Sequence, residues 1–212
     1  MNRKELLEKT QNHIYALFSE EATGHDYYHM ERVVNNAKKI LRYEKADPFL
    51  VEMAAWLHDL GDAKLHQGVD LSEQLIGEFL EGSEVDEDII KKIQQIVSEV
   101  SFSKNEKTSS LEAKIVQDAD RLDAIGAVGI ARCFAYGGSV GNLLYNPKSV
   151  EKKSSSVQHF HDKLFKLKNL MNTETAKKMA EERHVFMEGF IEQFYQEAVS
   201  YTHLTLPTTP YV

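Results

Sequence analysis

Cysteine is nearly absent from this sequence, since Cys133 is the only one among 212 residues. A single thiol cannot form an intrachain disulfide, so the chain fits a reducing compartment. Long apolar runs are absent too: no stretch of about 18 apolar residues occurs, and we expect no membrane-spanning helix. Residues 1–5 lead into no apolar signal core. We therefore expect a cytoplasmic protein without a membrane partner.

An excess of positive charge is also missing. The 33 acidic residues outnumber the 25 basic ones, and the formal net charge is -8. This balance argues against nonspecific binding to nucleic acid or to an anionic membrane. It is compatible with a small phosphorylated ligand, because a metal ion and a few local cations can hold one. With 42% apolar residues the chain can bury a core, and 212 residues give room for one sizeable domain or at most two small ones. Both a monomer and a homodimer remain open.

Apolar residues recur at helical spacing, and no convincing strand alternation is present. We therefore predict an all-α fold, a single domain that resembles a helical bundle. The predicted helices cover residues 4–20, 27–43, 71–80, 86–100, 111–125 and 156–171, one that begins at Asp47-Pro48, and a last one that begins at Thr173. Residues 137–141 are rich in glycine but lack the Lys-Ser/Thr pair of a phosphate-binding loop, so we interpret them as a flexible connector.

The end of the chain differs from the rest in composition. Residues 199–212 are rich in Thr and Pro and contain no Lys, Arg, Asp or Glu. They resemble a translated sequencing adapter, although a genuine unstructured tail is the alternative. We therefore assign residues 1–198 to the functional domain and residues 199–212 to a non-native tail, which we expect to be functionally inert.

The stretch from Ala54 to Lys64 carries the first chemical signal. Asp47 is a good N-cap, and a helix that starts there places His58 on the same face as Leu50, Ala54 and Leu57. Gly61 is expected to end this helix. A His and an Asp side by side at a buried edge are costly unless something binds them, and a divalent metal is one answer. The alternative is a solvated His58-Asp59 pair at a helix end.

Two further polar residues are predicted to face the interior. His29 falls on the inner stripe of the helix 27–43, and Asp120 lies next to the face of Val116. A lone inward His is more often a satisfied core residue than a ligand, but two on neighbouring helices favour a site. Together with His58 and Asp59 they form a mixed N/O set. Such a set suits Mn²⁺, Fe²⁺ or Co²⁺, and Zn²⁺ or Mg²⁺ less typically.

Four ordered blocks carry a family resemblance. They are Gly24-His-Asp-Tyr-Tyr-His29, Leu57-His-Asp-Leu-Gly-Asp-Ala-Lys64, Asp118-Ala-Asp-Arg-Leu-Asp-Ala-Ile-Gly-Ala127 and His159-Phe-His-Asp-Lys-Leu164. The chain resembles the HD-domain metal-dependent phosphohydrolases from about residue 3 to residue 198, and among them the YpgQ/YedJ-like branch. The resemblance implies an all-α fold and a metal held by His29, His58, Asp59 and Asp120. It also implies that nucleoside triphosphates are hydrolysed to monophosphate and pyrophosphate, with manganese preferred. The Gly-Tyr-Pro signature of cyclic-dinucleotide phosphodiesterases is absent.

Roles for the other polar residues follow from phosphoryl chemistry. Asp62, one helical turn beyond Asp59, is the candidate general base, or else a solvated loop carboxylate. Three cations could neutralise phosphate oxygens or be ordinary surface charges: Lys64, Arg121 and Lys163. His25 is favoured for phosphate binding or for supporting a ligand, with an i, i+4 metal pair with His29 as the alternative. Asp118 and Asp123 are expected to hydrogen-bond the metal ligands from outside or to cap helices.

Other functions remain open at this point. A nucleoside monophosphatase or an alarmone hydrolase would use the same metal chemistry and would differ in its products. A module that senses a nucleotide through a structural metal would bind without turnover. Retention of Asp62 and Lys64 beside the four metal-ligand residues favours an enzyme over such a module.

Overall fold

The computed structural model describes residues 2–20, 26–63, 66–100, 108–146 and 155–198. Their elements are α1 (Arg3–Phe18), α2 (Tyr27–Leu41), α3 (Pro48–Leu57), α4 (Ser72–Glu81), α5 (Glu87–Val100), α6 (Leu111–Asp123), α7 (Gly126–Ser139), α8 (Ser156–Asp162), the 3-10 helix η2 (Leu164–Leu170) and α9 (Glu174–Ala198). Over these residues the all-α prediction is confirmed. None of the helices described is both long and apolar enough to span a membrane. The tail 199–212 lies outside the described residues, so the division at residue 198 stays a prediction.

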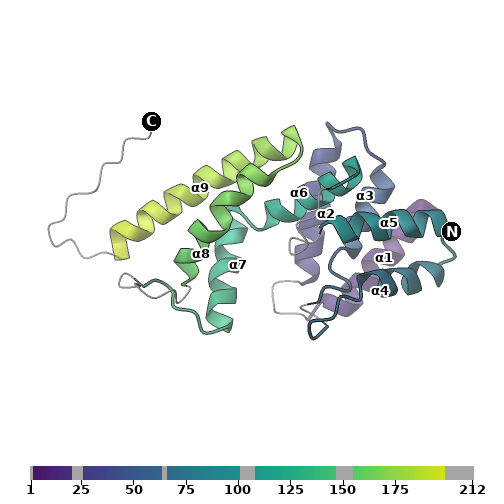
Figure 1. Cartoon of the computed structure of the whole chain (residues 1–212), viewed down its shortest axis with the longest axis horizontal. Helices are drawn as coiled ribbons and strands as arrows, with labels where there is room; N and C mark the ends of the chain where they lie inside the picture. Colours follow the sequence, from purple (N-terminus) through teal and green to yellow (C-terminus); the bar gives the residue numbers. More distant parts are fainter. Residues whose placement is uncertain (1, 21–25, 64–65, 101–107, 147–154, 199–212) are drawn as a thin grey trace.

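The helices gather in two groups joined by α6. In Figure 1, α1 to α5 lie at one end of the molecule and α7, α8 and α9 at the other, with α6 between them. α2 packs along α6 and also against α3. α3 is apolar on nearly every face, with Val51 and the run from Met53 to Leu57 buried. A helix that is apolar all round belongs in the core, so α3 holds its C-terminal end at a fixed depth inside the protein.

Side chains at the helix starts explain where the functional helices begin. Asp26 caps α2 by accepting a hydrogen bond from the backbone N–H of His29 at 2.6 Å. Asp47 caps α3 by accepting from Phe49 N at 2.9 Å, and Pro48 occupies the first turn, as predicted. Ser110 caps α6 in the same way. Each cap satisfies a backbone donor that the helix itself cannot pair, and so fixes the register of the residues that follow.

The prediction that Gly61 ends the third helix is wrong, because α3 already ends at Leu57 with His58 as its C-cap. Gly61 lies in the turn after the helix and has a packing role. A Cβ atom at this position would lie 2.2 Å from Ser72 N, and Gly61 O accepts a hydrogen bond from Leu71 N at 2.9 Å. Glycine therefore lets the turn that carries His58 and Asp59 press against the start of α4.

The connector predicted at residues 137–141 is partly helix, since α7 continues through Ser139. A Cβ atom at Gly137 would lie 2.0 Å from the Oγ atom of Ser156, so this glycine permits close packing of α7 on the start of α8. The single helix predicted for residues 156–171 is also interrupted. Lys163, at φ -134° and ψ -59°, separates α8 from η2.

Candidate metal centre

His29 is presented by the first turn of α2. Its side chain is 1% exposed, and its Nδ1 atom lies 2.8 Å from Asp123 Oδ2 on α6. Because its partner is a carboxylate, Nδ1 must carry a proton. In the neutral ring, Nε2 then carries no proton and has a free lone pair. This Nε2 atom points away from Asp123 and towards the residues that follow α3.

His58 lies at the C-terminal end of α3, and its ring carries the proton on Nδ1, as the ring of His29 does. Its Nδ1 atom donates to the carbonyl oxygen of Ala55 at 2.9 Å, which makes Nε2 the lone-pair nitrogen. Nε2 is buried and has no hydrogen-bond partner among the described residues. A buried ring nitrogen without a partner is unfavourable in a folded protein, unless a ligand completes it.

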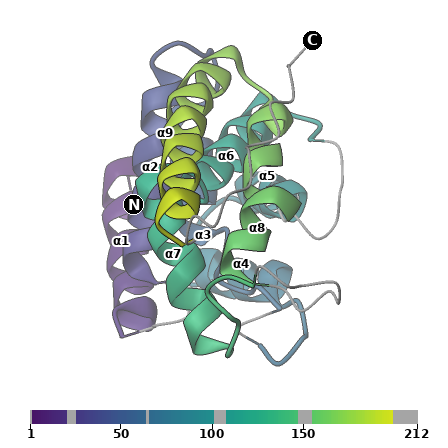
Figure 2. The same ribbon diagram turned by 90° about the vertical axis from the view of Figure 1, so that its left-hand side faces the viewer.

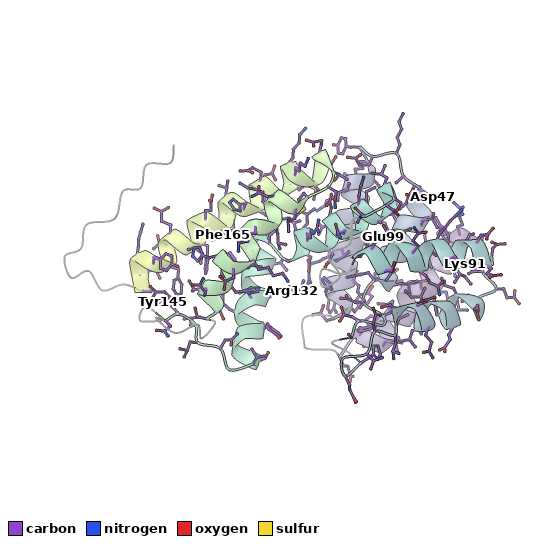
Figure 3. All side chains as sticks on the ribbon, in the orientation of Figure 1. Asp47, Lys91, Glu99, Arg132, Tyr145 and Phe165 are labelled. Carbon is purple, nitrogen blue, oxygen red and sulfur yellow. The ribbon has the colours of Figure 1, made fainter. Side chains whose placement is uncertain are left out.

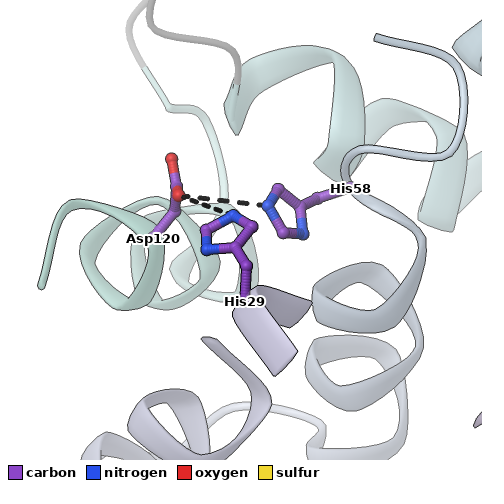
Figure 4. A group of neighbouring side chains, drawn as sticks. All are labelled: His29, His58 and Asp120. Atoms are coloured by element: carbon purple, nitrogen blue, oxygen red, sulfur yellow. Dashed lines mark ion pairs between the residues drawn. The ribbon is translucent and has the colours of Figure 1, made fainter. Parts of the chain in front are cut away.

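Two carboxylates face both of these nitrogens. Asp59 Oδ2 lies 3.3 Å from His29 Nε2 and 3.5 Å from His58 Nε2. Asp120 Oδ1 lies 3.5 Å and 3.9 Å from the same two atoms (Figure 4). One ligand atom each from His29, His58 and Asp120 fits within 4.8 Å. The fold thus brings together all four residues predicted as metal ligands.

The donor set fits a divalent cation. With both rings neutral, two nitrogen lone pairs and two carboxylate oxygens point at one another, and they repel unless a cation lies between them. Two imidazoles and two carboxylates are ligands that first-row divalent metals accept. The Asp120 side chain is 33% exposed, whereas those of His29 and His58 are almost fully buried. The site is therefore accessible on the side of Asp120.

Without a bound cation, the surroundings of His29 favour its protonated form. Burial lowers the pKa of His29, but hydrogen bonds to Asp123 and Asp59 and the charges of Asp59 and Asp120 together raise it to about 9. Because this pKa exceeds the ordinary value of 6.5, protonated His29 stabilises the metal-free fold below pH 6.5. That contribution is lost as the pH rises through about 9.

Metal affinity should therefore rise with pH. A metal must displace the His29 proton, so we expect the affinity for Mn²⁺ to increase by about tenfold per pH unit between about pH 6.5 and 8.5. Over the same range the metal-free protein should become less resistant to urea. Calorimetric titration with Mn²⁺ at several pH values measures the first effect. An affinity that does not change with pH would show that His29 is already neutral before the metal binds.

Asp123 supports His29 and is itself held by two guanidinium groups. Arg32 donates to it through Nε at 2.7 Å and through Nη2 at 3.2 Å, and Arg132 donates through Nη1. Arg132 reaches this position from α7, in the other group of helices (Figure 3). Burial raises the pKa of Asp123, but the hydrogen bonds from His29 and Arg32 and nearby positive charge hold it well below the ordinary range. Asp123 is thus placed as a charged acceptor that orients His29, one of its two expected roles.

Neither arginine was identified from the sequence. Arg32 lies one helical turn after His29, so a search for cations beside each predicted ligand would have found it. Arg132 could not be found in this way. Its contact with Asp123 depends on the turn between α6 and α7, for which the sequence offers no geometric signal.

Asp118 hydrogen-bonds residues outside the metal centre. It is fully buried and accepts hydrogen bonds from Asn172 N, Asn172 Nδ2, Thr173 N and Thr173 Oγ1 at 2.7 to 2.9 Å. Burial raises the pKa of Asp118 in spite of these bonds. They tie α6 to the residues just before α9, which corresponds to the capping alternative rather than to support of a metal ligand.

Loss of this carboxylate should destabilise the fold. Asp118→Ala removes the acceptor of four hydrogen bonds, two of them from the buried Thr173, and we expect the free energy of unfolding to fall by roughly 2–4 kcal/mol. Urea denaturation measures the change, with Lys114→Ala on the same helix as a control that should stay within about 0.5 kcal/mol of the parent. A loss below about 1 kcal/mol would mean that the pairing contributes little.

The remaining predicted residues are only partly placed. Asp62 is half-buried in the turn after Asp59, and its backbone N–H donates to Asp59 O at 3.2 Å. Arg121 donates through Nη1 to Leu170 O. Burial lowers the pKa of Arg121 below its ordinary value, although the charges of Asp118 and Asp120 act in the opposite direction. Lys163 stands at the end of α8. His25 and Lys64 lie outside the described residues. The roles suggested for these residues stay predictions.

Comparison with known proteins identifies the family of this chain. The model of the HD domain family matches residues 26–125, which include all four clustered residues. YpgQ of Bacillus subtilis is 41% identical over 194 residues, covering 90% of this chain and 92% of YpgQ. The chain belongs to the HD-domain family of metal-dependent phosphohydrolases.

Solved structures of similar proteins superpose on most of the chain. An HD-superfamily hydrolase from Bacillus thuringiensis is 42% identical and has a TM-score of 0.78, covering 93% of this chain and 98% of that one. YpgQ of Bacillus subtilis in complex with ADP is 38% identical with a TM-score of 0.77, covering 90% and 97%. The Lin1889 protein of Listeria innocua is 37% identical with a TM-score of 0.78, covering 93% and 98%.

Proposed function

We propose that this HD-domain protein is a nucleoside-triphosphate pyrophosphohydrolase that releases a nucleoside monophosphate and pyrophosphate and works best with Mn²⁺. The observation that carries the proposal is the convergence of His29 Nε2 and His58 Nε2 on the carboxylates of Asp59 and Asp120. The ADP bound to YpgQ supports a nucleotide as the ligand. The resemblance to the YpgQ/YedJ-like branch supports the triphosphate and manganese.

Each residue of the centre has a distinct part in this proposal. His29, His58, Asp59 and Asp120 would hold the cation, and Asp123 keeps the His29 proton on Nδ1 so that Nε2 stays available. A bound divalent cation polarises a phosphoryl oxygen and activates water for attack. Asp62 accepts the proton of the attacking water. The exposed side of Asp120 admits the phosphate chain of the substrate.

Product analysis tests the proposal. With a nucleoside triphosphate and Mn²⁺, we expect equal amounts of nucleoside monophosphate and pyrophosphate, and a slower reaction with Mg²⁺. Hydrolysis in ¹⁸O-labelled water shows which phosphorus is attacked, because the label remains on that product. A reaction with the His58→Ala variant controls for contaminating phosphatases.

Other outcomes would select other functions. Release of orthophosphate from a nucleoside monophosphate, with triphosphates untouched, would indicate a nucleotidase. Pyrophosphate released only from a guanosine alarmone would indicate an alarmone hydrolase. Binding of a nucleotide under Mn²⁺ without any product would indicate a sensing module.

A further inference from the structure

A cavity of about 370 Å³ lies where α2, the start of α7 and α9 meet. In Figure 2, α9 overlaps α2, and Arg183 on α9 donates to Asn36 Oδ1 on α2 at 3.0 Å. Three cations line the cavity: Arg32, Lys39 and Arg183. Asn35 and Asn36 line it as well, and the Asn36 amide is bonded to Ala119 O and to Arg183. Its volume is in the range of small-molecule sites.

The charge of this cavity is positive on a chain whose net charge is -8. Asp123 is the one carboxylate in its lining, against the three cations Arg32, Lys39 and Arg183, and it is paired with Arg32, with Arg132 and with His29. Arg32 uses Nε and Nη2 for Asp123, which leaves its Nη1 group outside that pair. Lys39 is exposed and forms no ion pair or hydrogen bond within the described part of the chain. Arg183 uses one N–H of Nη1 for Leu122 O and one N–H of Nη2 for Asn36 Oδ1. Each of these groups carries a second N–H, so donors of Arg183, Arg32 and Lys39 remain for an incoming anion.

The start of α7 adds further donors. Ile125 stands at its N-cap and makes no side-chain capping bond, so backbone N–H groups of the first turn are left without a side-chain acceptor. Gly126 has φ +79°, and a Cβ atom there would lie 3.0 Å from Cγ of Arg183. Glycine therefore lets the Arg183 side chain lie across the helix start. A guanidinium group and a helix N-terminus both favour phosphate oxygens.

The cavity is separate from the metal centre. His29 Nε2 faces Asp59 and Asp120, whereas His29 Nδ1 faces Asp123, whose side chain borders the cavity. The imidazole ring and Asp123 thus stand between the two places. His58, Asp59 and Asp120 are not part of the cavity lining.

We propose that this cavity is a second anion site, which binds the di- or triphosphate group of a small molecule independently of the metal. Arg32, Lys39, Arg183 and the first turn of α7 would contact the phosphate oxygens. The site does not depend on the proposed reaction, because it requires neither the cation nor Asp62.

Binding to the metal-free protein tests this site. Inorganic tripolyphosphate is titrated into the full chain in the presence of a chelator and followed by calorimetry. We expect saturable binding, weakened by about fivefold or more in Lys39→Gln, since one exposed phosphate contact is lost. Lys38→Gln is the matched control, because Lys38 is adjacent on α2 but pairs with Glu52 at 2.9 Å. It should bind as the parent does.

Two further variants complete the test. Arg183→Gln should weaken binding more than Lys39→Gln, provided that circular dichroism shows an unchanged fold. His58→Ala should leave binding unchanged, since His58 lies outside the cavity. The proposal is overturned if tripolyphosphate does not bind, if Lys38→Gln weakens binding as much as Lys39→Gln, or if His58→Ala removes it. Loss of nucleotide hydrolysis in any variant would bear on the proposed function alone.

Discussion

Replacing either His58 or Asp120 with alanine is expected to abolish both metal retention and turnover. Each variant removes one of the four residues at the centre, where each His Nε2 atom lies within 3.9 Å of carboxylate oxygens of Asp59 and Asp120. The remaining groups still repel one another but no longer surround a cation. Since the metal contributes several kcal/mol to phosphoryl transfer, we expect turnover to fall by about 10³-fold or more.

Metal analysis and kinetics on the same samples measure both effects. Asp88→Ala provides a matched control, because Asp88 is an exposed carboxylate on α5 and should leave metal content and rate unchanged. Asp120→Asn keeps the size of the side chain and separates lost charge from lost packing. Melting temperatures recorded without metal show whether each variant folds. A folded His58→Ala protein that retains stoichiometric Mn²⁺ would contradict the assignment of His58 as a ligand.

The inward direction of His29 and His58 could be predicted because helix periodicity is a local property. Asp26 and Asp47 cap helices whose phase is set by apolar side chains such as Val33 and Ala54, and the histidines share that phase. His29 on α2, Asp120 on α6 and His58 at the end of α3 then converge because the apolar stripes of these helices pack on one another. Periodicity therefore predicts the fold class and the inward direction of the two histidines, whereas Asp59 follows from its place beside His58.

What the sequence could not reveal depends on contacts between distant segments. The pattern suggests a helix end at Gly61 and a connector at Gly137, but the backbone of Ser72 leaves no room for a Cβ atom at Gly61, and the hydroxyl of Ser156 packs against Gly137. Arg132 on α7 contacts Asp123 at the end of α6, on the other side of the turn between these two helices. Asp118 and Asp123 both flank Asp120 in the sequence, yet their carboxylates bond to different elements. Neighbours in sequence on a helix point in different directions, and the sequence does not show what each one meets.

Asp62→Asn is expected to separate catalysis from metal binding. The substitution keeps the size of the side chain and the backbone hydrogen bond from residue 62 to Asp59 O, which is 3.2 Å in the parent. The four donors of the metal centre are untouched, so Mn²⁺ content should stay at the parent level. An amide cannot accept a proton from water near neutral pH, and we expect the rate to fall by about 10²–10⁴-fold.

A general base leaves a signature that a structural residue does not. In Asp62→Ala, a small carboxylate such as formate should restore part of the lost rate, because it can occupy the vacated space and accept the proton. Asp70→Asn is the matched control: Asp70 is an exposed carboxylate in the segment between α3 and α4 that accepts from Ser72 N at 3.0 Å. Its rate should remain within about threefold of the parent. If Asp62→Asn also strips the metal, residue 62 belongs with the ligands; if its rate is unchanged, the proton leaves by another group.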